Sequence, residues 1–444
     1  MAAVYPFSKV RRRSGVAREN VEFPRMVSIR QALRIDPLGD PGESLQEGLA
    51  RIGAGELLPP GSSVAVAVGS RGIGGIVPVV AGLVERLKGL GAVPFIVPAM
   101  GSHGGATARG QETVLRGLGV TEESVGAPVI SSMATVPLGT TPGGAEAFID
   151  ESALEAGAVV VVNRVAPHTG YCGPVQSGVV KMLAVGLGKR EGARSLHRHG
   201  FGAPQLIGEM AGLVLGSLRE VIAVALVEDG RRDLSRLEVL GKGEIRDREP
   251  GLLDLAASMS PGIPAGPVDL LIVDEMGKDI SGTGMDPGVT GRGKETAEGA
   301  GSGFSARRVV VLGLTSGSGG NATGVGHADI ITEGLYRSMD REVTYENVMT
   351  SGALERARLP VIAANDRDAV ALAMRSMGDP DIETLRVVRI KNTRELEELL
   401  VSPALAREIA GREGVLVSGE EATMEFDGSG KILPSGGKGG RRRR

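Results

Sequence analysis

Residues 64–72 read VAVAVGSRG, an apolar run of five residues that ends directly in Gly-Ser-Arg-Gly. Strands buried on both faces of a parallel sheet have such continuous apolar runs. An amphipathic stretch follows at residues 76–90, and a second apolar run, residues 93–97, leads into the loop MGSHGG at residues 100–105. This order of strand, loop, helix and strand indicates an α/β fold.

The same alternation continues along the chain. Further strands are predicted at residues 158–162, 221–227, 270–273, 309–314, 361–363 and 385–390. Further helices are predicted at residues 108–118, 177–187, 328–338, 343–350, 366–376 and 393–400.

A stretch rich in Pro, Gly and Asp, Asp247–Pro267, interrupts the pattern, and we place a domain boundary there. We therefore predict two α/β domains with a cleft between them. Residues 1–250 would form the N-terminal catalytic and cofactor-binding domain, residues 251–427 the C-terminal domain, and residues 428–444 a disordered basic tail. The first 60 residues are interpreted as an irregular lead-in with a short helix near residues 44–53.

The composition excludes several classes of protein. The chain has 444 residues, of which 41% are hydrophobic and 23% charged, as in globular proteins. A net charge of −3 gives no electrostatic footprint for nucleic acid or an anionic membrane. The single cysteine, Cys172, leaves no internal disulfide, and neither a secretory signal nor a membrane-spanning apolar run is found. We expect a cytoplasmic protein that binds neither nucleic acid nor membrane.

Two of the five histidines stand where α/β proteins bind ligands. His103 lies in the loop after the apolar run 93–97, and His168 follows the run 158–162. Ligands of such folds bind at the carboxyl ends of the strands. Histidine is both the commonest metal ligand and the usual acid or base near neutral pH. Both residues are therefore candidates, against the alternative that each is only a hydrogen-bonded loop residue.

Two cations add to the candidate site. Arg71 lies between a strand and a helix N-terminus, where its guanidinium could hold a carboxylate through two parallel hydrogen bonds. A solvated turn arginine is the alternative. Lys181 stands in the apolar segment SGVVKMLAVGLG, residues 177–188, where an ammonium is costly unless it is paired, modified or able to reach water. Lys181 is therefore either a snorkelling lysine or one whose amine is used covalently.

Taken in order, these segments resemble the nickel-dependent lactate racemase family. The matching features are GSRG at residues 69–72, GSH at 101–103, PH at 167–168, the pattern SGxxK at 177–181 and, sixteen positions later, His197. The resemblance covers about residues 64–200. Each motif alone is weak, and their shared order makes the resemblance more specific.

The family binds a nickel pincer nucleotide, a modified nicotinic acid mononucleotide in which two sulfurs and one ring carbon hold the nickel. The resemblance implies that Lys181 is tethered to this cofactor through a thioamide. It also implies that His197 is the protein's nickel ligand, with His199 as the less favoured alternative.

By the same resemblance, His103 and His168 would be the acid/bases for opposite faces of the substrate, and Arg71 would clamp its carboxylate. The chain would then be an isomerase, a racemase or epimerase of a 2-hydroxy acid that works by proton-coupled hydride transfer. Its partners would be that small acid and the enzymes that make the cofactor.

The chain also departs from the family's pattern. The gap between His168 and Lys181 is thirteen positions, longer than expected in the lactate enzymes, and it contains residues 171–176. In the C-terminal half, DEMGK at residues 274–278 and SGTGMDP at 281–287 do not match the lactate enzyme's substrate-side motif. We therefore expect a divergent member whose substrate is not lactate itself.

Two other functions stay open. The sequence GSGGNA at residues 317–322 follows an apolar run and fits the G-x-G-x-x-A pattern of pyridine-nucleotide oxidoreductases, although a plausible helix begins only after Val325. The other is a non-catalytic α/β protein that binds a small acid or nucleotide. Binding of free NAD would support the first, and a chain that stays nickel-free and unmodified at Lys181 would support the second.

Overall fold

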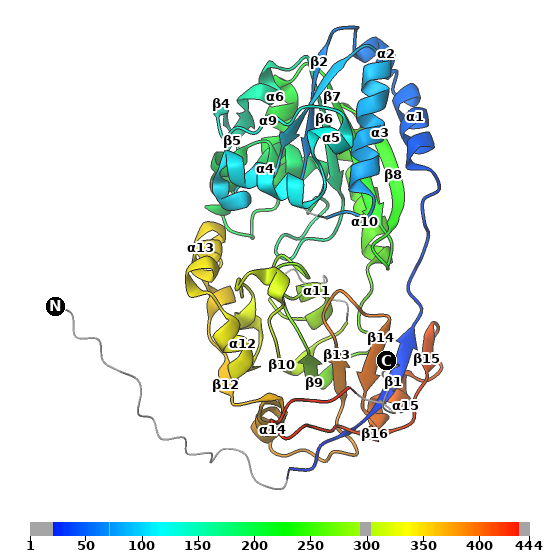
Figure 1. Ribbon diagram of the computed structural model, residues 1–444, viewed down its shortest axis with the longest axis vertical. Coiled ribbons are helices and arrows are strands. Elements are labelled where there is room, and N and C mark those ends of the chain that lie inside the picture. Colours follow the sequence, from blue (N-terminus) through cyan, green and yellow to red (C-terminus); the bar gives the residue numbers. More distant parts are fainter. Residues whose placement is uncertain (1–20, 71, 294–302, 435–444) are drawn as a thin grey trace, which may run out of the picture.

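The computed structural model describes residues 21–70, 72–293 and 303–434. They form two stacked units, each built around its own β-sheet (Figure 1). We call residues 41–259 the first domain, and residues 25–31 together with 268–434 the second domain. The predicted α/β fold with two separate sheets is confirmed. No helix in the described part of the chain is long and apolar enough to cross a membrane.

The sheet of the first domain has the strand order β3-β2-β6-β7-β8. Four strands are parallel and β8 is antiparallel to β7. Its strands are β2 (Ser63–Val68), β3 (Val93–Pro98), β6 (Ala158–Arg164), β7 (Val221–Glu228) and β8 (Leu234–Gly241). A separate hairpin joins β4 (Thr135–Thr140) and β5 (Glu146–Asp150).

Helices cover both faces of this sheet, which explains the continuous apolar run in β2. Val64, Val66 and Val68 pack into one hydrophobic core, while Ala65 and Ala67 pack into the core on the other face. The helices are α1 (Pro41–Arg51), α2 (Ala54–Leu57), α3 (Ile76–Gly89), α4 (Ala108–Gly117), α5 (Glu122–Val125), α6 (Glu151–Glu155), α7 (Val179–Lys181), a π-helical turn (Met182–Gly186), α8 (Lys189–His197), α9 (Gln205–Ser217) and α10 (Ile245–Met259).

The second domain has a larger mixed sheet, ordered β12-β11-β10-β9-β13-β14-β1-β15, with β16 also paired to β1. Its strands are β1 (Arg25–Gln31), β9 (Val268–Val273), β10 (Ala306–Val311), β11 (Ile330–Thr332), β12 (Val361–Ala363), β13 (Val387–Ile390), β14 (Glu398–Val401), β15 (Val415–Val417) and β16 (Ala422–Thr423). Its helices are α11 (Pro287–Thr290), α12 (Glu333–Ser338), α13 (Arg341–Ser351), α14 (Asp366–Ser376) and α15 (Pro403–Ile409).

Sheet membership differs from the division at residue 250. The strand β1 lies within the expected lead-in, yet it pairs with β14 and β15 of the second domain. The helix α10 runs through the first part of the predicted boundary and contacts β7 of the first domain. Its interior Pro250 made this segment resemble a linker. The chain therefore crosses between the domains twice, at residues 32–40 and 260–267.

Three further expectations need correction. The helix expected at residues 393–400 is irregular up to residue 397 and then enters the strand β14, and the one expected at 328–338 contains the strand β11 before α12. The start of the predicted disordered tail is also ordered. Residues 426–432 fold back through a Phe426–Ile432 bridge, and Ile432 is buried. The rest of the tail, residues 435–444, lies outside the described residues.

Candidate active site

In each sheet the order in which the chain adds strands reverses at one position. Both positions lie beside the same cavity. In the first domain the chain goes from β2 outward to β3 and then returns to β6, on the other side of β2. In the second domain β9 is flanked in the same way by β10 and β13. Loops diverge at such switch points and leave a crevice at the carboxyl ends of the strands, where α/β proteins bind ligands.

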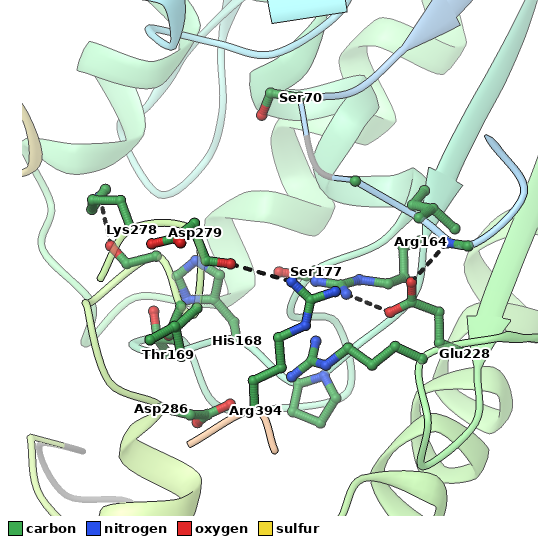
Figure 2. A pocket seen from close by; sticks show the side chains of 18 of the residues that line it. Ser70, Arg164, His168, Thr169, Ser177, Glu228, Lys278, Asp279, Asp286 and Arg394 are labelled. Atoms are coloured by element: carbon green, nitrogen blue, oxygen red, sulfur yellow. Dashed lines mark hydrogen bonds and ion pairs between the residues drawn. The ribbon is translucent and has the colours of Figure 1, made fainter. Parts of the chain in front are cut away.

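Two adjoining cavities lie there. The outer cavity, of about 650 Å³, is lined by both domains, including Arg164 and Glu228 from the first and Lys278 and Arg394 from the second (Figure 2). The inner cavity, of about 220 Å³, lies within the first domain. Four residues line both cavities: Ser70, Arg164, His168 and Ser177. A ligand in one cavity can therefore extend into the other.

The inner cavity brings together four of the five residues singled out in the sequence: His103, His168, Lys181 and His197. The fifth, Arg71, lies outside the described residues, and its neighbours Ser70 and Gly72 line the outer cavity. His199, the alternative ligand, is exposed on the surface. Of the two histidines near the end of α8, the geometry therefore favours His197.

His103 is the first residue after a tight turn, and its ring contacts Ser70. The Ser70 hydroxyl and His103 Nδ1 are 2.5 Å apart. Gly104 follows with a φ of +66°, and a Cβ there would lie 2.5 Å from the backbone of Gly110, so only glycine fits. This explains part of the Gly-rich loop, since the turn has to close against α4.

A buried polar network, which was not predicted from the sequence, supports the His103 loop. The amide of Gln111 donates to the carbonyls of Gly101 and His103 at 2.8 and 3.3 Å. Lys189 Nζ lies 3.1 Å from Asp150 and donates to Gln111 at 3.4 Å. All three side chains are fully buried, and burial lowers the pKa of Lys189 while Asp150 opposes that shift. The network fixes where the His103 ring stands.

His168 is held in one orientation by its own loop. Its Nδ1 accepts hydrogen bonds from the backbone N–H groups of Gly170 and Tyr171, at 3.0 and 2.9 Å, and its ring lies 5.0 Å from that of Tyr171. Its backbone N–H donates to Gln176. The unusual residues 171–176 thus build the support for His168.

These hydrogen bonds also assign the tautomer of His168. A nitrogen that accepts two N–H donors carries no proton, so the neutral ring has its proton on Nε2. In this tautomer His168 Nε2 can donate a hydrogen bond to a substrate, and Nδ1, the basic nitrogen, is held by the two backbone N–H groups. The expectation that His103 and His168 are equivalent bases therefore does not fit the geometry.

Lys181 ends a short helical turn that a buried carboxylate caps. Its Nζ lies 5.0 Å from the centre of the Tyr171 ring. Glu249 of α10 accepts a hydrogen bond from the N–H of Val180 at 2.8 Å, and a Cβ on Gly178 would lie 2.4 Å from this carboxylate. A π-helical turn follows Lys181, a feature often found at functional sites.

Glu249 makes the stability of this region depend on pH. Burial raises its pKa from 4.5 to about 7, against the opposing effect of the Val180 and Val179 N–H groups. Since the folded state favours the protonated form, this stability is present below pH 4.5 and is lost as the pH rises through about 7. At about 1.4 kcal/mol per pKa unit, the loss is about 3 kcal/mol.

We expect the Glu249→Gln variant to lose this dependence. Urea unfolding of both proteins at pH 5 and pH 8 measures it: the wild type should lose about 3 kcal/mol more than the variant between the two values. An equal change in both proteins would show that Glu249 titrates normally.

His197 is kept neutral by its surroundings. Burial, and then the charge of Lys181, lower its pKa to about 4, against a hydrogen bond to the Thr350 backbone that raises it. Its Nδ1 is buried and has no hydrogen-bond partner among the described residues. A neutral imidazole with an unused nitrogen is the form in which histidine binds metals. No group of three or more His, Cys, Asp or Glu side chains suited to a metal occurs in the described ranges.

A residue of the second domain contacts this end of the site. The guanidinium of Arg356 lies 4.8 Å from the centre of the Phe201 ring, and Phe201 packs edge-on against Tyr171 at 4.9 Å. The few aromatic residues of the chain are thus partly gathered around Lys181 and His197. This cluster packs behind Lys181 and His197, which line the inner cavity.

The glycine-rich loop at residues 317–322 does not have the architecture of a dinucleotide site. A 3₁₀ turn, Val325–His327, and then the strand β11 follow it, where a dinucleotide fold has a helix N-terminus. Its glycines serve packing instead. A Cβ on Gly317 would lie 2.6 Å from Asp279, and one on Gly320 would lie 2.7 Å from Asp340.

No protein-family model matches the chain, and no curated protein matches it. Among solved structures, the chain is similar to the lactate racemase apoprotein from Thermoanaerobacterium thermosaccharolyticum, at 12% identity over 81% of this chain and 94% of that one, with a TM-score of 0.46. It is also similar to a protein from Thermotoga maritima, at 16% identity over 63% and 72% of the two chains, with a TM-score of 0.46. Likenesses of this degree say nothing about activity, which depends on the site itself.

Proposed function

We propose that this protein is a racemase or epimerase of a 2-hydroxy acid that uses a nickel pincer nucleotide. The observation that carries the proposal is the meeting of His103, His168, Lys181 and His197 around one cavity at the carboxyl edge of the first sheet. These are the residues whose order in the sequence resembles the lactate racemase family.

The residues present fit such a cofactor. Lys181 offers an amine at the cavity wall, where a thioamide link to a nicotinic-acid-derived carbonyl carbon would leave it uncharged. His197 offers a buried neutral nitrogen without a partner among the described residues, which a nickel ion would satisfy. When bound, the group would supply the acceptor for the hydride at C2 of the substrate.

The side chains of the protein would handle the proton and the charge. The Ser70 hydroxyl can accept a hydrogen bond from His103 Nδ1; in that tautomer the lone pair of the neutral ring is on Nε2, which would take the proton of the 2-hydroxyl group. His168, with its proton on Nε2, would donate a hydrogen bond to the substrate. Arg71, outside the described residues, is proposed as the clamp for the substrate carboxylate.

The test is production of the chain together with the cofactor-making enzymes, followed by racemisation assays on single enantiomers of 2-hydroxy acids. Conversion of one enantiomer into the other supports the proposal. A nickel-loaded protein that converts none of them would favour the non-catalytic binding protein instead.

Replacing His197 with alanine is expected to lower nickel retention while leaving the organic adduct on Lys181. Only one metal ligand is lost, and since loss of a ligand's outer partner already costs about 10- to 100-fold in metal affinity, loss of the ligand should cost at least as much. Nickel content after dialysis against a chelator, together with intact mass, measures both. His199→Ala is the matched control, because this exposed histidine lies two positions away. Equal nickel loss in both variants would contradict the assignment.

A further inference from the structure

The outer cavity has a cationic wall that the proposed reaction does not use. Arg232 comes from the turn between β7 and β8, and Arg394 from the segment after β13 of the second domain. Arg164, at the end of β6, lines the same cavity (Figure 2). Burial is the largest effect that lowers the pKa of Arg232; the charges of Arg164 and Arg394 lower it further, and those of Glu228 and Asp286 oppose the shift.

Arg232 stands where the backbone favours glycine. The turn is closed by a hydrogen bond between Asp229 N–H and the Asp233 carbonyl, and by the Asp229 carboxylate, which accepts from the N–H groups of Arg231 and Asp233. Its last residue, Arg232, has a φ of +67°. Three-residue hairpin turns usually place glycine in this left-handed position. Strained non-glycine residues of this kind cluster at functional sites.

The loop that contains Gly74 packs closely against this turn. A Cβ on Gly74 would lie 2.6 Å from the carbonyl oxygen of Arg232, and the Gly74 N–H donates to Glu228 at 3.1 Å. The backbone of Arg232 is thus packed closely against Gly74, and its half-buried side chain lines the outer cavity.

Four carboxylates line the outer cavity; Asp233 is exposed, and the other three are already engaged. Glu228 accepts from Arg164 at 2.6 Å and from Gly74, Asp279 accepts from Thr315, and Asp286 caps α11. Arg232, by contrast, has no side-chain hydrogen bond among the described residues, and Arg394 donates only to the Asp279 carbonyl, at 3.3 Å. The guanidinium groups of Arg232 and Arg394 therefore keep donors that can bind an anion in the outer cavity.

We propose that Arg232 and Arg394 bind a second anionic group of the substrate, a carboxylate or phosphate at the end away from the 2-hydroxy acid. The proposed substrate class is therefore dianionic 2-hydroxy acids, which the proposed function alone does not specify. A ligand of this kind spans both cavities, with its reacting carbon beside His103 and His168 and its far end between the domains. The outer cavity, about 650 Å³, has the size of an ordinary small-molecule pocket.

The test is a binding experiment on the full chain made without the cofactor enzymes. Calorimetric titrations with malate, 2-hydroxyglutarate and 3-phosphoglycerate are compared with titrations with lactate and 2-hydroxybutyrate. We expect the dianionic acids to bind about ten- to a hundredfold more tightly, the range for charged hydrogen bonds. Equal affinity for both groups would overturn the proposal.

Arg232→Gly separates binding from folding. Glycine relieves the left-handed strain, so the variant should keep its Tm within about 5 °C of the wild type. Its affinity for the dianionic acids should nevertheless fall to the level of lactate, and Arg394→Gln should do the same. Arg236→Ala, an exposed arginine on the same hairpin, is the control and should keep the preference. A preference retained in both Arg232→Gly and Arg394→Gln would overturn the proposal.

A titration with nicotinic acid mononucleotide tests whether these arginines bind the phosphate of the cofactor instead of the second anion of the substrate. If Arg232→Gly weakens binding of this nucleotide and leaves that of the dianionic acids unchanged, the wall serves the cofactor and the substrate proposal is wrong. The binding preference needs neither nickel nor turnover. The substrate preference can therefore be confirmed even if no racemisation is found, and it can be refuted even if racemisation is found.

Discussion

Lys181→Ala, produced together with the cofactor-making enzymes, is expected to carry no covalent adduct and to show no racemisation above the uncatalysed rate. No other lysine lines the inner cavity among the described residues, so nothing replaces the missing amine. Intact mass, nickel content and activity of the same sample measure the effect.

The loss should not come from unfolding. The Lys181 ammonium lies over the Tyr171 ring, and such cation–π contacts contribute about 0.5–2 kcal/mol. A folded domain of this kind tolerates that change with a small shift in Tm. Lys391→Ala is the control, because Lys391 is an exposed lysine paired only with Glu395. An adduct that survives in Lys181→Ala would show that the cofactor is attached elsewhere.

The fold could be predicted where strands are buried on both faces. β2 and β6 have continuous apolar runs, and α14 was expected at the residues where it is found. β1 and β14 could not be predicted in the same way. They pair with each other across about 370 residues of chain, and both mix exposed and buried positions. Their structure depends on a partner that no local window contains.

The residues of the candidate site also divide into those that could be predicted from the sequence and those that could not. His103, His168 and Lys181 stand out because a polar group in a Gly-rich or apolar segment is unusual. The residues that hold them did not stand out. Lys189 opens the charged run Lys-Arg-Glu, which looks solvated, yet its side chain is fully buried against Asp150. Charged residues on amphipathic helices look the same in sequence whether they face water or a buried partner.

Replacing His103 and replacing His168 are expected to slow the reaction for different reasons. His103→Gln should lower single-turnover rates by about 10²–10⁴-fold, the usual effect of losing a general base. His168→Gln loses one hydrogen bond to the reacting oxygen, for which about 10²–10³-fold is typical. In each variant the loss should be the same for both enantiomers. Reduction of the cofactor by each pure enantiomer of the best substrate, followed in a stopped-flow spectrometer, measures this.

One base can serve both enantiomers if the substrate has two anionic ends. When the planar keto acid turns about its carbon–oxygen axis, the oxygen stays beside His103 while the two ends exchange places. Arg232 and the proposed carboxylate clamp, Arg71, would then each have to accept either anion. The acid limb of the pH–rate profile should then vanish in His103→Gln and persist in His168→Gln. A loss confined to one enantiomer in each variant would instead require two bases, and the backbone hydrogen bonds to His168 Nδ1 would have to break during the reaction.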